Sequence, residues 1–179
     1  VTTIEPNAFH LCNLLSLSLP QSLTTIAGGG SYRGAFADNK NLSVVVIPDN
    51  VTSIGYEAFS GCTSLKTIVF GANVTTLDRG VLRGCTSLTE VSLPKKLTII
   101  PRECFVNCPA LSKVILPEGL TTIQSYAFEN CSSLQTIQLP STIRVMTQAF
   151  SGCTGLVEIE IPEGVSILDN TFVNCPNLS

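Results

Sequence analysis

Few residues of this 179-residue chain combine the types and spacing that catalysis requires. Its one histidine, His10, is the only base that a serine or cysteine nucleophile could use, and its place in the sequence predicts a solvated loop. Glu158 and Glu160 would share one face of a strand roughly 7 Å apart, which suits acid–base chemistry, and Glu163 lies close by. A solvated acidic strip is the simpler interpretation of these carboxylates. The sequence therefore predicts no enzyme.

Cysteines are the other chemically notable residues, with eight in the chain. A metal site needs several His, Cys, Asp or Glu side chains that converge. A lone histidine without any C-x-x-C pair does not provide them, so we expect no metal and no cofactor. Cys104 stands where other copies of a repeated motif have alanine, and we expect the other seven to form a buried ladder of free thiols. Disulfides between neighbouring turns, about 4.8 Å apart, are the alternative.

The cysteines share a register because the chain is built from a repeat, which is clearest in Val51–Asn73. A fixed period of 20 to 30 residues indicates a solenoid, in which each unit covers its neighbour because one unit alone cannot bury an apolar face. We expect residues 1–179 to form one solenoid of about seven and a half turns. The aromatic position of the A-F-x-x-C motif recurs at Phe9, Phe36, Phe59, Leu82, Phe105, Phe128, Phe150 and Phe172.

Each repeat predicts two extended pieces and a tail. The L-x-x-I-x-L-P piece, as in Leu88–Pro94, alternates like a strand with one buried face, and its proline ends the strand. The shorter piece, as in Leu97–Ile100, predicts a second short strand. The A-F-x-x-C tail predicts one turn of α- or 3₁₀-helix, because Ala and Phe both need to point inward. The expected fold class is an α/β repeat with a parallel sheet.

The second repeat carries an insertion between Ile26 and Ala35. Three consecutive glycines exclude a strand or helix interior, so we expect a mobile loop pushed out of the stack. A phosphate-binding loop would need a following Lys and Ser or Thr, which are absent. A tolerated insertion is the simpler interpretation, and a ligand contact by Tyr32 and Arg33 at the tip of the loop is the alternative.

The pattern L-x-x-I-x-L-P-x-x-L-x-x-I-x-x-x-A-F-x-x-C resembles the BspA-like leucine-rich repeats over the whole chain. The resemblance implies a right-handed arc with a parallel sheet on the concave side and short second strands on the convex side. It also implies a surface-exposed or secreted microbial protein, with adhesion or host-protein binding as the usual suggestion. The departures, which are conservative in size, are Asn39 for Cys, Leu82 for Phe, Cys104 and Thr171 for Ala, and Gly71 for Pro.

Outward residues of the main strands form the predicted binding surface on the concave sheet. Val44, Val46 and Val69 would place contiguous apolar surface where water reaches it, which is informative in a way that one exposed valine is not. Glu90 and Lys113 would form a cross-strand pair beside it. The preference of β-branched residues for strands explains the valines without any partner. The candidate binding residues are Val44, Val46, Thr67, Val69, Glu90, Ser92, Lys113 and Ile115.

Composition narrows the classes of partner. A net charge of −3 gives no electrostatic footprint for nucleic acid or an anionic membrane. The sequence has no run of 18 apolar residues, so we expect no membrane insertion. Because the chain begins and stops inside repeats, we expect a fragment of a longer protein. Oligomeric state, the oxidation of the cysteines and glycosylation of Asn41, Asn50 or Asn73 stay open.

The expected function is a non-enzymatic, adhesin-type binding module that is secreted or on the cell surface. It would recognise a protein or glycan ligand through its concave sheet. The alternative is a structural spacer that carries other domains and has no ligand of its own. The ligand itself is not predicted, because many functions share one repeat fold.

Overall fold

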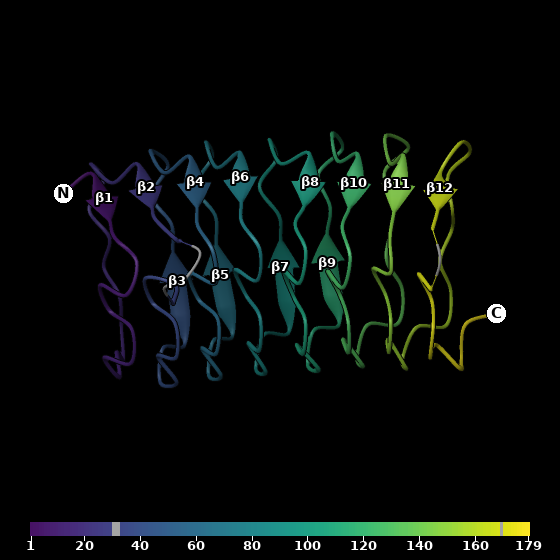
Figure 1. Ribbon diagram of the computed structural model, residues 1–179, viewed down its shortest axis with the longest axis horizontal. Helices are drawn as coiled ribbons and strands as arrows, with labels where there is room; N and C mark the ends of the chain where they lie inside the picture. Colours follow the sequence, from purple (N-terminus) through teal and green to yellow (C-terminus); the bar gives the residue numbers. More distant parts are fainter. Residues whose placement is uncertain (30–32, 169) are drawn as a thin grey trace.

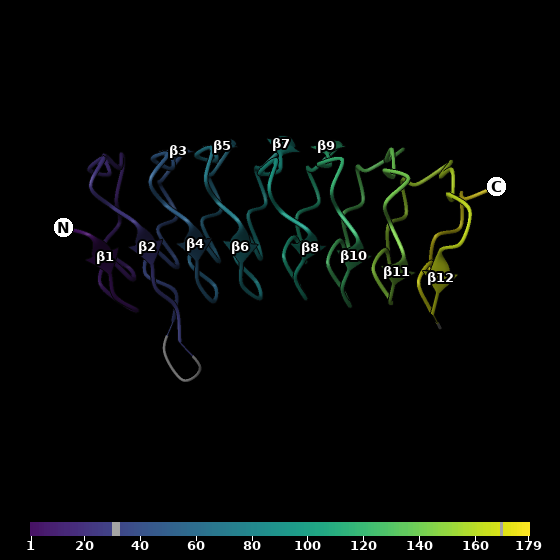
Figure 2. The same cartoon turned by 90° about the horizontal axis from the view of Figure 1, so that it is seen from above.

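The computed structural model describes residues 1–29, 33–168 and 170–179 as a stack of coils with the two termini at opposite ends (Figure 1). Each coil adds one layer to the stack, and the layers follow a nearly straight course in Figure 2. Because this course is nearly straight, the expected arc with a concave sheet is not pronounced, and we call the outward side of the main strands the main-strand face. Of the two candidate residues in the loop, Tyr32 falls outside the described residues, whereas Arg33 lies within them.

Two rows of short parallel strands run along the stack. The main strands are β3 (Val44–Val46), β5 (Thr67–Val69), β7 (Glu90–Ser92) and β9 (Lys113–Ile115). The second strands are β1 (Thr3–Ile4), β2 (Thr25–Ile26), β4 (Ser53–Ile54), β6 (Thr76–Leu77), β8 (Ile99–Ile100), β10 (Thr122–Ile123), β11 (Val145–Met146) and β12 (Ser166–Ile167). The two kinds of extended piece expected from the sequence are thus confirmed. The pieces at 14–20, 134–140 and 156–162 are the exceptions, because the first forms no strand and a single bridge from Thr136 to Glu158 joins the other two.

Both rows are interrupted in the middle of the chain. The second strands form one sheet in the order β1-β2-β4-β6 and another in the order β12-β11-β10-β8, and the main strands split into β3-β5 and β7-β9. Pro101 accounts for the break between β6 and β8. At the equivalent position of the next coil, Gln124 donates its backbone N–H to the Ile100 carbonyl at 3.0 Å. Proline has no N–H to donate to Leu77.

The A-F-x-x-C tails form ribbons of turns, not the helical or 3₁₀ turns expected from the sequence. The N–H of Phe59 donates to the Val81 carbonyl of the next coil at 2.9 Å, whereas the N–H of Ser60 donates back to Glu57 at 3.0 Å. Alternate donors therefore leave the segment, and a helix needs its N–H groups to bond within it. Positive φ values of 49° at Glu57 and 71° at Gly61 also interrupt a right-handed helix.

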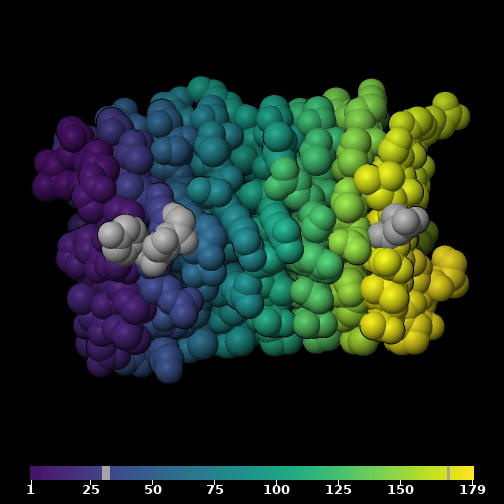
Figure 3. All heavy atoms as spheres, viewed as in Figure 1, coloured from purple at the N-terminus to yellow at the C-terminus, as the bar shows by residue number. Residues whose placement is uncertain are grey.

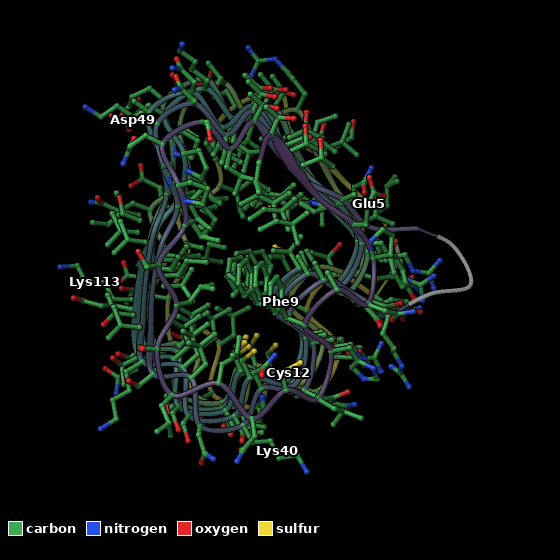
Figure 4. The ribbon with its side chains drawn as sticks, turned by 90° about the vertical axis from the view of Figure 1, so that its left-hand side faces the viewer. Glu5, Phe9, Cys12, Lys40, Asp49 and Lys113 are labelled. Carbon is green, nitrogen blue, oxygen red and sulfur yellow. The ribbon has the colours of Figure 1, made fainter. Side chains whose placement is uncertain are left out.

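The core is a set of columns that run the length of the stack. Viewed along the stack, Phe9 lies inside the coil and Lys113 points away from it (Figure 4). Phe105 and Phe128 are fully buried, with parallel rings whose centroids are 5.2 Å apart. Leu82 interrupts this aromatic column, as its sequence position predicts. Within the described residues no helix is long and apolar enough to cross a membrane.

Candidate functional site

The main-strand face presents the residues that the sequence singled out. Each main strand has a buried central residue and two exposed neighbours, because successive side chains of a strand point to opposite sides. Val44, Val46 and Val69 are 49%, 56% and 50% exposed, and Ile115 is 51% exposed. These are large fractions for apolar side chains, so the expected exposure to water is confirmed.

Strand register brings the candidate residues together in two blocks. In the first block Val44 lies beside Thr67 and Val46 beside Val69. The second block is the β7–β9 pair, where Glu90 lies beside Lys113. The two blocks belong to separate sheets, so the continuous columns expected from the sequence are divided. The exposed valines lie in the first block, whereas the second block holds the charged side chains together with the exposed Ile115.

Glu90 and Lys113 are opposite each other in register but form no ion pair. The ion pairs among the described residues involve other side chains. The expected cross-strand pair is therefore confirmed in register, although no ion pair joins its two side chains. On an exposed strand pair, side-chain entropy and solvent screening offset most of the attraction between such charges.

An open groove of about 870 Å³ lies on the same face beyond β9. Lys113 and Ile115 line one end of it, and the carboxylates of Glu158 and Glu160 line the other. Glu158 and Glu160 are exposed, which agrees with a solvated acidic strip. No group of His, Cys, Asp or Glu in the described part of the chain could hold a metal ion. The outward residues of the following coils that line the groove are Thr136, Gln138, Glu158 and Glu160.

The cysteine column is a ladder of free thiols, as expected. All eight cysteines are free; six are buried, whereas Cys12 is exposed at the first coil and Cys175 is partly exposed at the last. Each buried thiol of the column donates to a backbone carbonyl of the preceding coil, as Cys108 does to Leu82 at 3.2 Å. Burial raises the pKa of Cys62, Cys108 and Cys153 to about 12. These thiols therefore stay protonated and are poor nucleophiles.

Two polar residues have surroundings that the sequence did not predict. The His10 ring nitrogen Nε2 lies 3.1 Å from the carboxylate oxygen Oδ2 of Asp38, so His10 is not merely solvated. Asn39 is fully buried in the cysteine column. Its amide donates to the carbonyls of Phe9 and Phe36 at 2.8 and 2.9 Å and accepts from the N–H of Leu14 at 2.9 Å. These bonds satisfy the polar side chain and explain why asparagine is tolerated there.

Sequence reasoning also missed a cluster of arginines around a buried carboxylate. Glu103 is 7% exposed, and its oxygens accept from Arg79 at 2.8 Å, Arg83 at 2.7 Å and Arg102 at 3.1 Å. The overall charge of −3 concealed this local gathering of positive charge. Arg79 and Arg102 each stand three residues before the aromatic position of the repeat, so aligning every column would have revealed the cluster.

The repeat matches a known family. The model of the BspA type leucine rich repeat region, in six copies, matches residues 2–116, 30–147 and 79–179. This chain belongs to the BspA-type leucine-rich repeat family. Repeats of this family generally serve in protein interactions or as scaffolds.

Solved structures of leucine-rich repeat proteins share the fold. The T. pallidum leucine-rich repeat protein is 29% identical with a TM-score of 0.89, covering 99% of this chain and 82% of that chain. A leucine rich cell surface protein of Faecalibacterium prausnitzii is 21% identical with a TM-score of 0.60, covering 99% and 76%. A leucine-rich repeat protein of Bacteroides ovatus is 22% identical with a TM-score of 0.51, covering 99% and 69%. No curated protein matches this sequence.

Proposed function

We propose that this BspA-type protein is a non-enzymatic, adhesin-type binding module that recognises a protein ligand through its main-strand face. The observation that supports this function is the block of Val44, Val46 and Val69, each about half exposed and held side by side by the β3–β5 register. A family whose repeats generally mediate protein interactions agrees with it. A strand does not require apolar residues at these outward positions, because threonine also favours strands.

The chemistry of the face favours a protein ligand over a glycan at this block. Its exposed residues are β-branched and aliphatic, and no aromatic side chain occupies the strands β3, β5, β7 or β9. Sugars are usually held by polar groups and flat aromatic rings. An apolar centre edged by Thr67, Glu90 and Lys113 has instead the composition of a protein–protein interface with a polar rim.

We infer a location on the cell surface or in the secreted fraction. The structure from Faecalibacterium prausnitzii, which shares the fold, is that of a leucine rich cell surface protein. A ligand outside the cell would then be the natural partner of the main-strand face. Surface labelling of intact cells with an antibody against this protein would test the location, and labelling only after permeabilisation would contradict it.

The test of binding is a screen of the protein against extracellular-matrix proteins and glycans. The variant Val46→Asp/Val69→Asp should lose a saturable protein ligand without unfolding, because both side chains face water. Thr136→Asp/Gln138→Asp is the matched control, since it adds the same charge to exposed positions of the same face, away from the valines. The control should bind like the unchanged protein.

Each outcome of the screen bears on the proposed function. Unchanged affinity in the valine variant would contradict a site at β3 and β5. Equal losses in the valine variant and the control would indicate that added negative charge alone weakens binding. If no protein or glycan bound, a structural spacer without a ligand of its own would be the better interpretation.

A further inference from the structure

Arginine is concentrated in and just before the A-F-x-x-C tails, in the segments that follow the second strands, and four of the five arginines in the chain lie there. Figure 3 shows the side of the stack that faces away from the main strands. Arg33, Arg79 and Arg102 occupy one column, three residues before the aromatic position, and Tyr56 fills that column between Arg33 and Arg79. Neighbouring coils are about 4.8 Å apart, so this column spans roughly 14 Å. We call these four residues, together with Arg83, the arginine strip.

Buried carboxylates hold the arginine side chains in place without neutralising them. Three guanidinium groups share the single carboxylate of Glu103, and Arg33 lies 3.4 Å from Glu57. Four positive groups against two carboxylates leave a local charge of +2, in a chain whose net charge is −3. The carboxylate of Asp78 accepts from the backbone N–H of Arg79 at 2.7 Å. Counting this carboxylate lowers the local charge to +1, which is still positive.

The guanidinium groups keep most of their donors free for a ligand. Each has five N–H groups and gives one hydrogen bond to a carboxylate. The side chains of Arg33, Arg79, Arg83 and Arg102 are 42–62% exposed. The hydrogen bond with Glu103 raises the pKa of Arg79, which keeps this group charged at every physiological pH. Salt, and not pH, should therefore control the binding of an anion.

A shallow hollow of about 330 Å³ continues the strip toward the C-terminus. Tyr126 lines its edge, and the guanidinium carbon of Arg102 lies 5.5 Å from the centre of the tyrosine ring. Gln148, Ser151 and Asn170 provide amide and hydroxyl groups beside this ring. A flat aromatic face with hydrogen-bonding groups around it suits a sugar ring, and the neighbouring guanidinium groups suit sulfate or carboxylate.

We propose that the arginine strip and this hollow bind an anionic polysaccharide that carries sulfate or carboxylate groups along its chain. A nucleic acid fits less well, because the positive charge is confined to four coils of a protein with net negative charge. This surface lies on a different side of the stack from the valines of the main-strand face. The protein thus has separate sites for a protein ligand and for an acidic glycan.

The experiment measures binding of dextran sulfate, with uncharged dextran and an oligodeoxythymidylate of matched charge as comparison probes. Arg83→Gln/Arg102→Gln should weaken binding of dextran sulfate by about tenfold or more, because two cationic contacts are lost. It leaves Arg79 hydrogen-bonded to Glu103. Lys95→Gln/Lys96→Gln is the matched control, since it removes the same charge from the exposed turn after β7 and should change affinity less than about twofold.

A variant of opposite sign sharpens the test. Glu103→Gln removes the carboxylate that the three arginines share while keeping an oxygen that accepts hydrogen bonds, so it should tighten binding several-fold. A thermal melt establishes that each variant is folded before its affinity is compared. Val46→Asp/Val69→Asp should bind dextran sulfate like the unchanged protein, which separates this site from the proposed protein-binding site.

Three results would overturn the proposal. Equal losses in the arginine and lysine variants would indicate general attraction to charge without a site. Tighter binding of the oligodeoxythymidylate than of dextran sulfate would point to a nucleic acid. Absence of binding at roughly 50 mM salt, where such contacts are strong, would leave the arginine strip with a structural role only.

Discussion

Three consecutive valines of β3 show how differently the inside and the outside of this stack behave. Val45 is fully buried, whereas its neighbours Val44 and Val46 are about half exposed. The inward positions of successive coils stay apolar, as Ile68, Val91 and Val114 do after Val45. The outward positions change freely. The column that starts at Val46 continues as Val69, Ser92, Ile115, Gln138 and Glu160.

The difference teaches that the repeat specifies the fold through its inside and leaves its outside free to vary. An inward residue contacts the coils above and below it, so a change there must be compatible with two neighbours. Where the inside does change, a local compensation is visible. Thr171 replaces alanine and is buried, and its hydroxyl donates to the Leu168 carbonyl at 2.6 Å. No compensation of this kind constrains an outward side chain.

The largest expected effect is the removal of an inward ring from the middle of the stack. Phe105→Ala should destabilise the protein by about 3–5 kcal/mol, because the ring is fully buried and leaves a cavity. Urea unfolding followed by circular dichroism measures the loss. Phe9→Ala is the control, since Phe9 lies in the first coil, packs against one neighbouring coil and is 39% exposed. Similar losses for both variants would contradict the dependence on two neighbours.

Asn39 allows a test of compensation inside the stack. Asn39→Leu fills a similar volume but leaves the N–H of Leu14 and two carbonyls without their partner, which should cost about 1–3 kcal/mol. Asn39→Cys restores the residue found elsewhere in the column and its sulfur donor, so it should cost less. Thermal melts of the two variants measure the difference. A leucine variant as stable as the native protein would refute the importance of these hydrogen bonds.

The inside of the fold was predictable from the sequence because each inward column repeats one residue type. The period placed the phenylalanine and cysteine columns, the two rows of strands and the interruption at Leu82. The tails were less predictable. Ala and Phe point inward as expected, yet the donors between them alternate between the segment and the next coil. That alternation depends on contact between coils, which local helix propensity does not contain.

The outside was predictable only where strand alternation applies. Exposure of Val44 and Val46 follows from the period of two along a strand, and so does the pairing of Glu90 with Lys113. The absence of a salt bridge between that pair depends on side-chain rotamers, which register does not specify. The arginine strip joins residues about 23 positions apart, such as Arg79 and Arg102, and is visible only when every column is aligned.

The buried thiols predict a loss of stability in alkali. Burial raises the pKa of Cys62, Cys108 and Cys153 to about 12, whereas an unfolded thiol has a pKa of roughly 8.5. Between these values the unfolded chain releases protons that the folded chain retains, so stability falls as pH rises. The contribution of each buried thiol to stability should be constant below about pH 8 and then fall by up to about 1.4 kcal/mol per pH unit.

Urea unfolding at a series of pH values measures this slope. Cys108→Ala should reduce the alkaline slope by about one proton, although it also lowers stability at neutral pH by leaving a small cavity. Equal slopes in the Cys108 variant and the native protein would show that the buried thiols do not cause the loss.

The smallest expected effect tests adjacent residues of one strand. Threonine has nearly the shape of valine and also favours strands, so a valine-to-threonine change alters polarity with little change in volume. Val45→Thr should destabilise the protein by about 1–3 kcal/mol, because the new hydroxyl would be buried among apolar side chains without a hydrogen-bond partner. Val46→Thr should change stability by less than about 0.5 kcal/mol, because water reaches that side chain.

Thermal and urea unfolding of the two single variants measure both values. Equal destabilisation at positions 45 and 46 would contradict the division between a constrained inside and a free outside. If only Val46→Thr weakens ligand binding, the two positions of one strand separate stability from recognition.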